Sequence, residues 1–375
     1  MAESTKPTEA AHRPKSKSAK SKEPFYSVSP LWEDITPLPM VDGPPGQTDP
    51  GPALATIAYS PRYSEAMSYL RAVMATNEFS RRTLDLTEDI ISMNPSHYTV
   101  WLYRAKILKV LWGEENISTE DGVKAELDWL EGISERNLKN YQIWHHRQLM
   151  VSLLTSLPSG ETEFLTHILS FDSKNYHVWT YRQWLCRHFP ESLLATDVEL
   201  ASIDALINDD VRNNSAWNHR YFVCFGAEEL QAIEKEGGNR KDVLAQGKLV
   251  VDEDVVDREI NYAKDHIAWA PQNPSPWNYL KGVLKRAGIP ITNMQVFCEG
   301  FVGGRNADLF GENVKSSHAV DWLAEIYQLD GNAERSKQCL DALGKKWDPI
   351  RRKYWDYRAE QLGRGEEDQG SAQAA

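Results

Sequence analysis

The chain has 375 residues, a formal charge of −12 and 41% hydrophobic residues, which suits a water-soluble chain too long for one ordinary compact core. The acidic charge argues against a nucleic-acid partner, and no apolar run is long enough for membrane insertion. Four widely separated cysteines show no metal-ligand spacing, so neither a disulfide framework nor a metal bound by this chain is predicted. The first 22 residues lack the apolar block of a secretory signal, and we predict a cytoplasmic protein.

Composition divides the chain into four parts. Residues 1–24 form a predicted disordered basic tail, with six Lys or Arg and two Glu in its first 22 positions. Proline-rich residues 25–62 predict an extended strap. Helical periodicity fills residues 63–363, with a polar loop insertion at 235–248, and residues 364–375 are a second predicted disordered tail.

A short word centred on tryptophan recurs through the helical part. Arg stands three residues after Trp in five of six copies, Leu280 replaces it in the fifth, and Tyr or His always stands two residues after Trp. These spacings place the word on one face of an amphipathic helix with the Trp as a core anchor. The anchors are Trp101, Trp144, Trp179, Trp217, Trp277 and Trp355.

The Trp spacings are 43, 35, 38, 60 and 78 residues, and the first three have the length of a helical hairpin. The last gap divides at Trp322, which we interpret as a decayed copy. Partner helices are expected near 81–93, 125–135, 161–171, 194–207 and 255–269. Because one hairpin cannot bury its own apolar face, neighbours must stack. We therefore predict an all-α protein, a right-handed α-α superhelix forming a crescent of about seven repeats.

The helix starts carry the candidate chemistry. Lys139-Asn140-Tyr141 and Lys174-Asn175-Tyr176 are the same tripeptide in two copies, and an anion site or simple solvation of an exposed lysine would each explain the lysine. Tyr residues three before Trp, including Tyr98, fit inter-repeat packing or a site. His146 occupies the Tyr/His slot and is predicted to be structural, whereas His177 lies outside it. The repeat Arg residues are predicted to hydrogen-bond carbonyls or acidic side chains.

The words KNYQIWHHR, KNYHVWTYRQW, DVRNNSAWNHRYFV and SPWNYLKG resemble the repeats of protein prenyltransferase α subunits, from about Leu31 to Leu362. The stretch from Leu31 to Val73 resembles the α subunit shared by farnesyltransferase and type I geranylgeranyltransferase, with length and insertions like fungal examples. That resemblance implies a catalytic Lys139 facing an isoprenoid diphosphate, with Tyr141, Tyr176 and His177 lining the same region. It also implies that Gln142 and Tyr98 border the CaaX peptide, and it assigns no role to Lys174.

The resemblance further implies a β subunit that holds the catalytic Zn²⁺, with Mg²⁺ accompanying the diphosphate and no metal on this chain. The expected reaction transfers a farnesyl or geranylgeranyl group to the Cys thiol of CaaX proteins. Two alternatives stay open. One is the α subunit of the Rab-specific type II enzyme, and the other is a non-catalytic helical-repeat adaptor.

Overall fold

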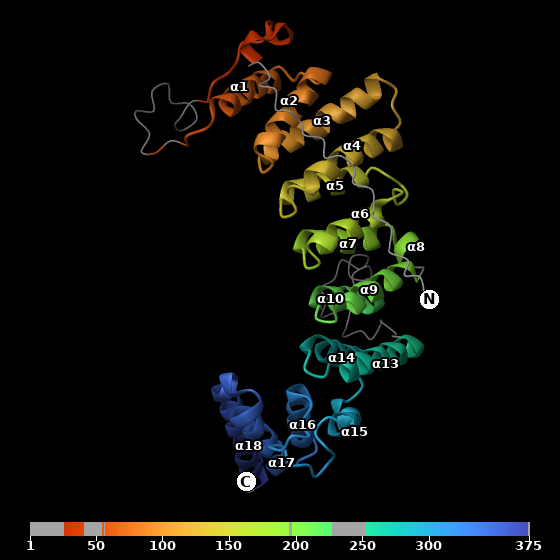
Figure 1. Ribbon diagram of the computed structural model, residues 1–375, viewed down its shortest axis with the longest axis vertical. Helices are drawn as coiled ribbons and strands as arrows, with labels where there is room; N and C mark the ends of the chain where they lie inside the picture. The colour runs from red at the N-terminus through yellow and green to blue at the C-terminus, as the bar shows by residue number, and fades with distance from the viewer. Residues whose placement is uncertain (1–25, 41–54, 56, 195–196, 227–251, 374–375) are drawn as a thin grey trace, which may run out of the picture. The chain divides into compact units, whose positions relative to one another are not determined.

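The computed structural model describes residues 26–40, 55, 57–194, 197–226 and 252–373, with side chains placed through residue 362. All regular secondary structure in these residues is helical, which confirms the all-α prediction (Figure 1). The α-helices are α1 Pro61–Ala75, α2 Arg81–Met93, α3 Tyr98–Glu114, α4 Thr119–Ser134, α5 Tyr141–Val151, α6 Glu161–Phe171, α7 Tyr176–His188, α8 Pro190–Leu193, α9 Val198–Asp209, α10 Asn214–Tyr221, α13 Glu253–Trp269, α14 Pro274–Ala287, α15 Gln295–Glu299, α16 Ser317–Leu329, α17 Ala333–Ala342 and α18 Arg352–Gln373.

Short 3-10 and π turns complete the described chain. The 3-10 turns are Tyr26–Val28, Pro30–Trp32, Ile291–Met294 and Pro349–Arg351, and the π turns are Phe222–Gly226 and Leu343–Trp347. The predicted tail 1–24 and the insertion 235–248 lie outside the described residues. The backbone of α18 continues to Gln373, past position 363 where the sequence predicts the array to end, through a stretch without proline.

The chain divides into two compact units, residues 1–125 and 126–375. In the first unit, the segment expected to be extended begins with two 3-10 turns, because Pro30 favours the start of a helical turn. Trp32 is buried there and meets the ring of Tyr69 edge-on at a centroid distance of 5.5 Å. Arg82 lies 5.1 Å from the Trp32 ring and pairs with Asp34 and Glu78. Trp32 and Arg82 thus help to hold the strap to α1 and α2.

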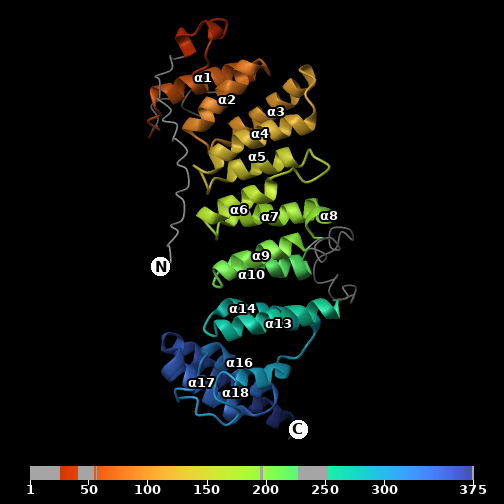
Figure 2. The same cartoon turned by 45° about the vertical axis from the view of Figure 1, so that its right-hand side comes forward.

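In the second unit the Trp-containing helices contact one another in chain order, α5 with α7, α7 with α10, and α10 with α14. Each follows an antiparallel partner helix, and Figures 1 and 2 both show these hairpins stacked on one another. The partner helices α2 and α6 have the predicted bounds, while α4, α9 and α13 differ by a few residues at their ends. All six repeat tryptophans are buried.

An asparagine begins most of the Trp helices and also bonds the preceding repeat. The Asn175 Oδ1 accepts the backbone N–H groups of His177 and Val178, which caps α7. Its Nδ2 donates to the Leu138 carbonyl, and the Trp144 Nε1 donates to that same carbonyl. One carbonyl therefore receives a tryptophan from its own repeat and an asparagine from the next. The same pair of bonds recurs at Ser173 (from Trp179 and Asn213) and at Val211 (from Trp217 and Asn273).

Three of the repeat arginines pair with buried glutamates of the partner helices, as the sequence predicts for them, while Arg104 donates to the Leu84 carbonyl and Arg358 pairs with Asp321. Arg147 forms two hydrogen bonds to Glu161, of 2.8 and 2.7 Å, and Tyr181 of the next repeat donates to the same carboxylate at 2.7 Å. Each glutamate thus joins the Arg of one repeat to the Tyr or His of the next. The equivalent groups are Arg182, Glu199 and His219, followed by Arg220, Glu259 and Tyr279.

The copy predicted at Trp322 is present, but its register differs from the prediction by two residues. Ser316 replaces the capping asparagine, since its Oγ accepts the Ala319 N–H and donates to the Pro271 carbonyl. Counting from this cap puts Val320 in the Trp position and Trp322 in the Tyr/His slot. Trp322 accordingly packs on Trp277 at 5.2 Å, the distance at which Tyr279 packs on Trp217. The spacing of tryptophans alone could not reveal this shift.

The group of Arg, Glu and Tyr or His that joins one repeat to the next is absent between the Trp277 copy and this copy. Leu280 stands in place of the arginine and is fully buried, and Trp322 stands in place of Tyr or His. In the described residues the buried glutamates are Glu126, Glu161, Glu199 and Glu259, all N-terminal to these substitutions. A buried carboxylate without its arginine would be strongly destabilising, so an apolar residue at 280 fits the absence of a buried acid in the following copy.

Candidate functional site

The candidate site residues occupy the loops and first turns that precede the Trp helices of the second unit. Asn140 caps α5 by accepting the N–H groups of Gln142 and Ile143, and Asn175 caps α7 in the same way. Lys139 therefore lies one residue upstream of a helix cap, and Tyr141 is the first residue of α5. Since the positive end of the helix dipole faces this edge, it suits an anion.

The structure brings Lys139, Tyr141, Tyr176 and His177 together. The His177 ring meets the Tyr141 ring edge-on at 4.2 Å and the Tyr176 ring at 5.7 Å. Partial burial lowers the pKa of His177 below its usual value, while a hydrogen bond to the backbone carbonyl of Lys139 opposes that shift. The neutral form of His177 therefore predominates at pH 7. It ties the loop of one repeat to the helix start of the next.

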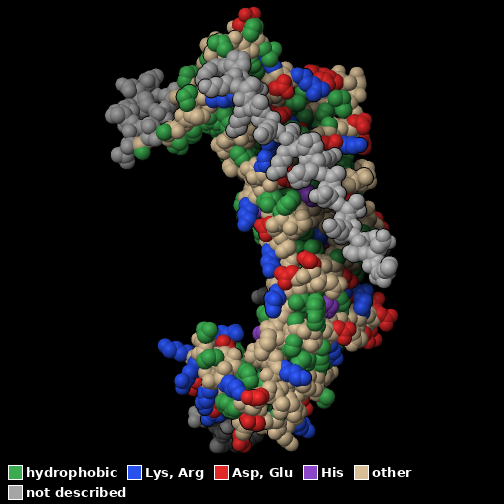
Figure 3. All heavy atoms as spheres, in the orientation of Figure 1, with side chains coloured by type: hydrophobic (Ala, Val, Ile, Leu, Met, Phe, Trp, Pro, Cys, Tyr) green, Lys and Arg blue, Asp and Glu red, His purple; other side chains and the backbone are tan. Residues whose placement is uncertain are grey.

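The lysine and tyrosine side chains at this edge remain open to solvent. The side chain of Lys139 is 80% exposed, and its Nζ lies 3.7 Å from a carboxylate oxygen of Asp172. Tyr141 and Tyr176 are each 67% exposed, although both rings are large enough to pack between repeats. Inter-repeat packing, the alternative explanation of these tyrosines, does not bury them. Figure 3 shows Lys and Arg side chains at intervals along this edge of the second unit.

The remaining predicted residues occupy related positions. Gln142 is half-buried in the first turn of α5, next to Tyr141. Tyr98 is the first residue of α3 in the first unit, the position that Tyr141 has in α5, and is 61% exposed. Lys174 pairs with Asp210 at 3.2 Å and is 54% exposed, which agrees with a solvated lysine. His146 is buried and bonded to Glu126 at 2.9 Å, as expected of the structural slot.

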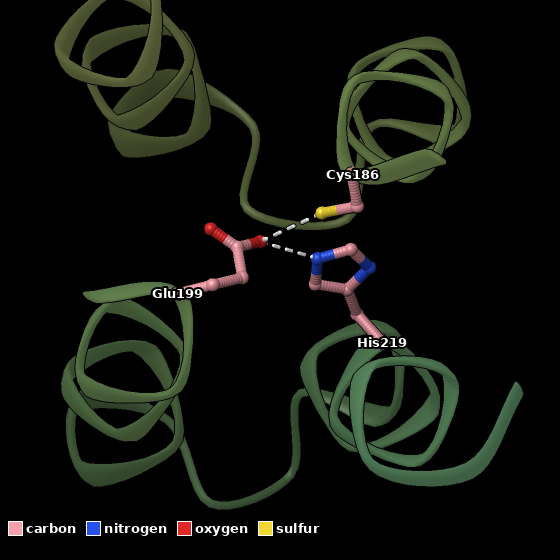
Figure 4. A group of neighbouring side chains, drawn as sticks. All are labelled: Cys186, Glu199 and His219. Carbon is pink, nitrogen blue, oxygen red and sulfur yellow. Dashed lines mark hydrogen bonds and ion pairs between the residues drawn. The ribbon is translucent and has the colours of Figure 1, made fainter. Parts of the chain in front are cut away.

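Sequence spacing missed one buried group with metal-ligand chemistry. Cys186, Glu199 and His219 offer ligand atoms within 4.8 Å of one another, and Figure 4 shows them converging from three helices. However, Arg182 already forms two hydrogen bonds to Glu199, so a cation occupies the place of a metal. This group is therefore the repeat ion pair, with Cys and His in slots that tyrosine or aliphatic residues fill elsewhere.

The Glu199 and His219 side chains of this group are expected to make the stability of the protein sensitive to acid. Burial raises the pKa of Glu199, but the bonds from His219 and Arg182 outweigh it and hold the pKa at about 2, against 4.5 for a free glutamate. Burial also lowers the pKa of His219. Both groups bind protons more weakly in the folded state, so stability is lost as pH falls below about 6.5 for the histidine and from 4.5 towards 2 for the glutamate.

We expect the free energy of unfolding to fall by roughly 3 kcal/mol through Glu199 alone between pH 5 and pH 2. Urea unfolding across that pH range measures it. Glu199→Gln should be less stable at pH 7 and show a smaller loss on acidification. An equal pH dependence in the variant and the wild type would show that this carboxylate is not the titrating group.

Hairpins of this stack match the repeats of protein prenyltransferase α subunits. The model of the protein prenyltransferase alpha subunit repeat matches residues 80–111, 123–154, 158–189 and 197–226. The protein farnesyltransferase/geranylgeranyltransferase type-1 subunit alpha of Candida albicans is 38% identical over 88% of this chain and 97% of its own length. The chain belongs to this family of type-1 α subunits, and is a subunit of a protein prenyltransferase.

A solved structure agrees with this assignment. Candida albicans protein geranylgeranyltransferase-I complexed with GGPP has a chain that is 37% identical, with a TM-score of 0.72 over 88% of this chain and 97% of that chain. The geranylgeranyl transferase type-2 subunit alpha of Rattus norvegicus is more distant, with 29% identity over 60% of this chain and 37% of its own. Within the described residues, no helix has the length and apolar character that a membrane span requires.

Proposed function

We propose that this chain works as one half of a heterodimeric enzyme, transferring farnesyl or geranylgeranyl from the isoprenoid diphosphate to the Cys thiol of CaaX proteins, and that it is active only with a β subunit. The exposed side chain of Lys139, on a loop that the His177 ring bonds through the backbone and that leads into Tyr141, carries the proposal. An exposed cation at such an edge is suited to a ligand anion supplied across an interface. A cytoplasmic location stays a prediction.

In the proposed mechanism, Lys139 acts on the leaving group. As the bond between the isoprenoid C1 and the diphosphate oxygen breaks, negative charge grows on the diphosphate, and an ammonium placed beside it stabilises the transition state. Tyr141 and Tyr176 offer hydroxyl donors in the same region, and neutral His177 holds the Lys139 loop. Gln142 and Tyr98 are proposed to border the peptide.

The metals of the reaction do not fit this chain in its described part, because the one group with suitable ligands is filled by Arg182. We therefore propose that Zn²⁺, which would lower the pKa of the substrate thiol, is held by the β subunit. Mg²⁺ is proposed to accompany the diphosphate.

Reconstitution with a β subunit tests the proposal. The purified heterodimer is expected to transfer farnesyl or geranylgeranyl to a CaaX peptide, and either subunit alone is expected to transfer none. Transfer that requires a Rab protein and an escort protein would instead support the type II alternative. A stable solitary chain that binds peptides, does not associate with a β subunit and ignores prenyl diphosphates would support the adaptor.

A further inference from the structure

Asp172, the acidic residue beside Lys139, is held by bonds of its backbone and of its side chain. Asp172 is the residue at which α6 ends, and its backbone N–H donates to Ile168 while its carbonyl accepts the Asn175 N–H. One carboxylate oxygen accepts the Lys174 N–H at 3.4 Å, and the other lies 3.7 Å from the Lys139 Nζ. The Asp172 side chain is 26% exposed, against 80% for Lys139. A fixed carboxylate thus faces a long, exposed lysine from the neighbouring repeat.

The next repeat has the same arrangement of an aspartate and a lysine. Asp210 ends α9, its Oδ1 accepts the Arg212 N–H at 2.9 Å, and its Oδ2 accepts from the Lys174 Nζ at 3.2 Å. In both loops one oxygen closes the turn and the other faces the lysine of the previous repeat. The two pairs share this arrangement, although the Lys174 pair is the shorter. They differ in that His177 bonds the Lys139 loop, whereas the repeat after Lys174 has Ser215 at that position.

We infer that Asp172 is a positioning residue for Lys139. The inference rests on the proposed role of Lys139 in the transfer reaction. The lysine stem has four rotatable carbons, and the adjacent dipole of α5 disfavours a cation, so the ammonium needs a partner to stay at the helix start. Asp172 supplies that partner from a rigid turn. Restricting the ammonium before the substrate binds lowers the cost of placing it against the leaving group.

A positioning residue and a residue that only maintains the fold predict different effects on isoprenoid binding and on the rate of the chemical step. A carboxylate near an anion site repels the diphosphate, so removing its charge does not weaken isoprenoid binding. Loss of the partner does let the ammonium leave the productive position, and the chemical step slows. A residue that only maintained the fold would weaken both binding and chemistry when it was replaced.

The test compares Asp172→Asn with Asp210→Asn in the reconstituted heterodimer. Asparagine keeps the turn bond and removes the charge, and Asp210 is the matched control in the next repeat. We expect Asp172→Asn to lower the single-turnover rate about two- to five-fold, the range of an exposed ion pair, with undiminished affinity for the isoprenoid diphosphate. Asp210→Asn should match the wild type, and Asp172→Glu should recover part of the rate.

The Lys139→Ala background completes the design. If Asp172 acts through Lys139, adding Asp172→Asn to Lys139→Ala changes nothing further. An additive loss, an equal loss in Asp210→Asn, or a wild-type rate in Asp172→Asn while Lys139→Ala is slow would overturn the inference alone. A wild-type rate in Lys139→Ala would overturn the proposed role of Lys139 as well.

Discussion

Replacing Lys139 with alanine is expected to slow the chemical step of the heterodimer about ten- to a thousand-fold, the effect of losing one electrostatic contact to developing charge. The Lys139 side chain is 80% exposed and its ammonium pairs with Asp172 on one side, which leaves room for a ligand on the other. Assembly with the β subunit and affinity for the peptide should stay nearly unchanged. Single-turnover transfer measured with saturating isoprenoid diphosphate gives the rate.

Lys174→Ala is the matched control for this prediction. Lys174 precedes the asparagine cap of the next repeat and pairs with Asp210, but the repeat that follows has Ser215 at the position from which His177 bonds the Lys139 loop. It should react at the wild-type rate. If both variants were equally slow, general positive charge along the edge would explain the effect better than a specific contact from Lys139.

Trp144→Ala is expected to lower the free energy of unfolding by about 3–5 kcal/mol, because it leaves a large cavity in the core. Trp144 is 4% exposed and packs on Phe164 and Tyr181, both of the next hairpin. Its Nε1 also bonds the Leu138 carbonyl, one residue from Lys139. Thermal and urea unfolding of the heterodimer measure the loss.

Tyr141→Ala serves as the control, since it removes an aromatic ring from the same helix at a position that is 67% exposed. Its unfolding midpoint should stay close to that of the wild type. A Trp144→Ala variant that melts like the Tyr141→Ala variant would contradict the assignment of Trp144 as a core anchor.

Much of the fold is predictable from the sequence because local patterns control it. The Trp, Arg and Tyr/His spacing predicts which helix face is buried, and α2 and α6 begin and end where periodicity places them. The prediction that the repeat arginines bond acidic side chains is confirmed at Arg147, Arg182 and Arg220. The predicted register at Trp322 was wrong because a tryptophan can be buried in the Tyr/His position of the repeat as well as in the Trp position.

Bonds between repeats lie beyond sequence reasoning. Nothing local indicates that Asn175 caps α7 and also bonds the Leu138 carbonyl 37 positions earlier. The buried Cys186, Glu199 and His219 likewise meet only because two repeat slots converge on one carboxylate. Their resemblance to a metal site is resolved by Arg182, whose bonds to Glu199 are a tertiary feature.

The amino-acid sequence by itself determined the helical class, the hairpin period and the identity of the residues at the helix starts, since each depends on neighbours within a few turns of chain. Only the tertiary structure decided that His177 reaches back to Lys139 and Tyr141, and that Asp172 faces the Lys139 ammonium. These partners are more than thirty positions apart. They meet because stacked repeats bring equivalent loops together, a consequence of packing between repeats that no single repeat encodes.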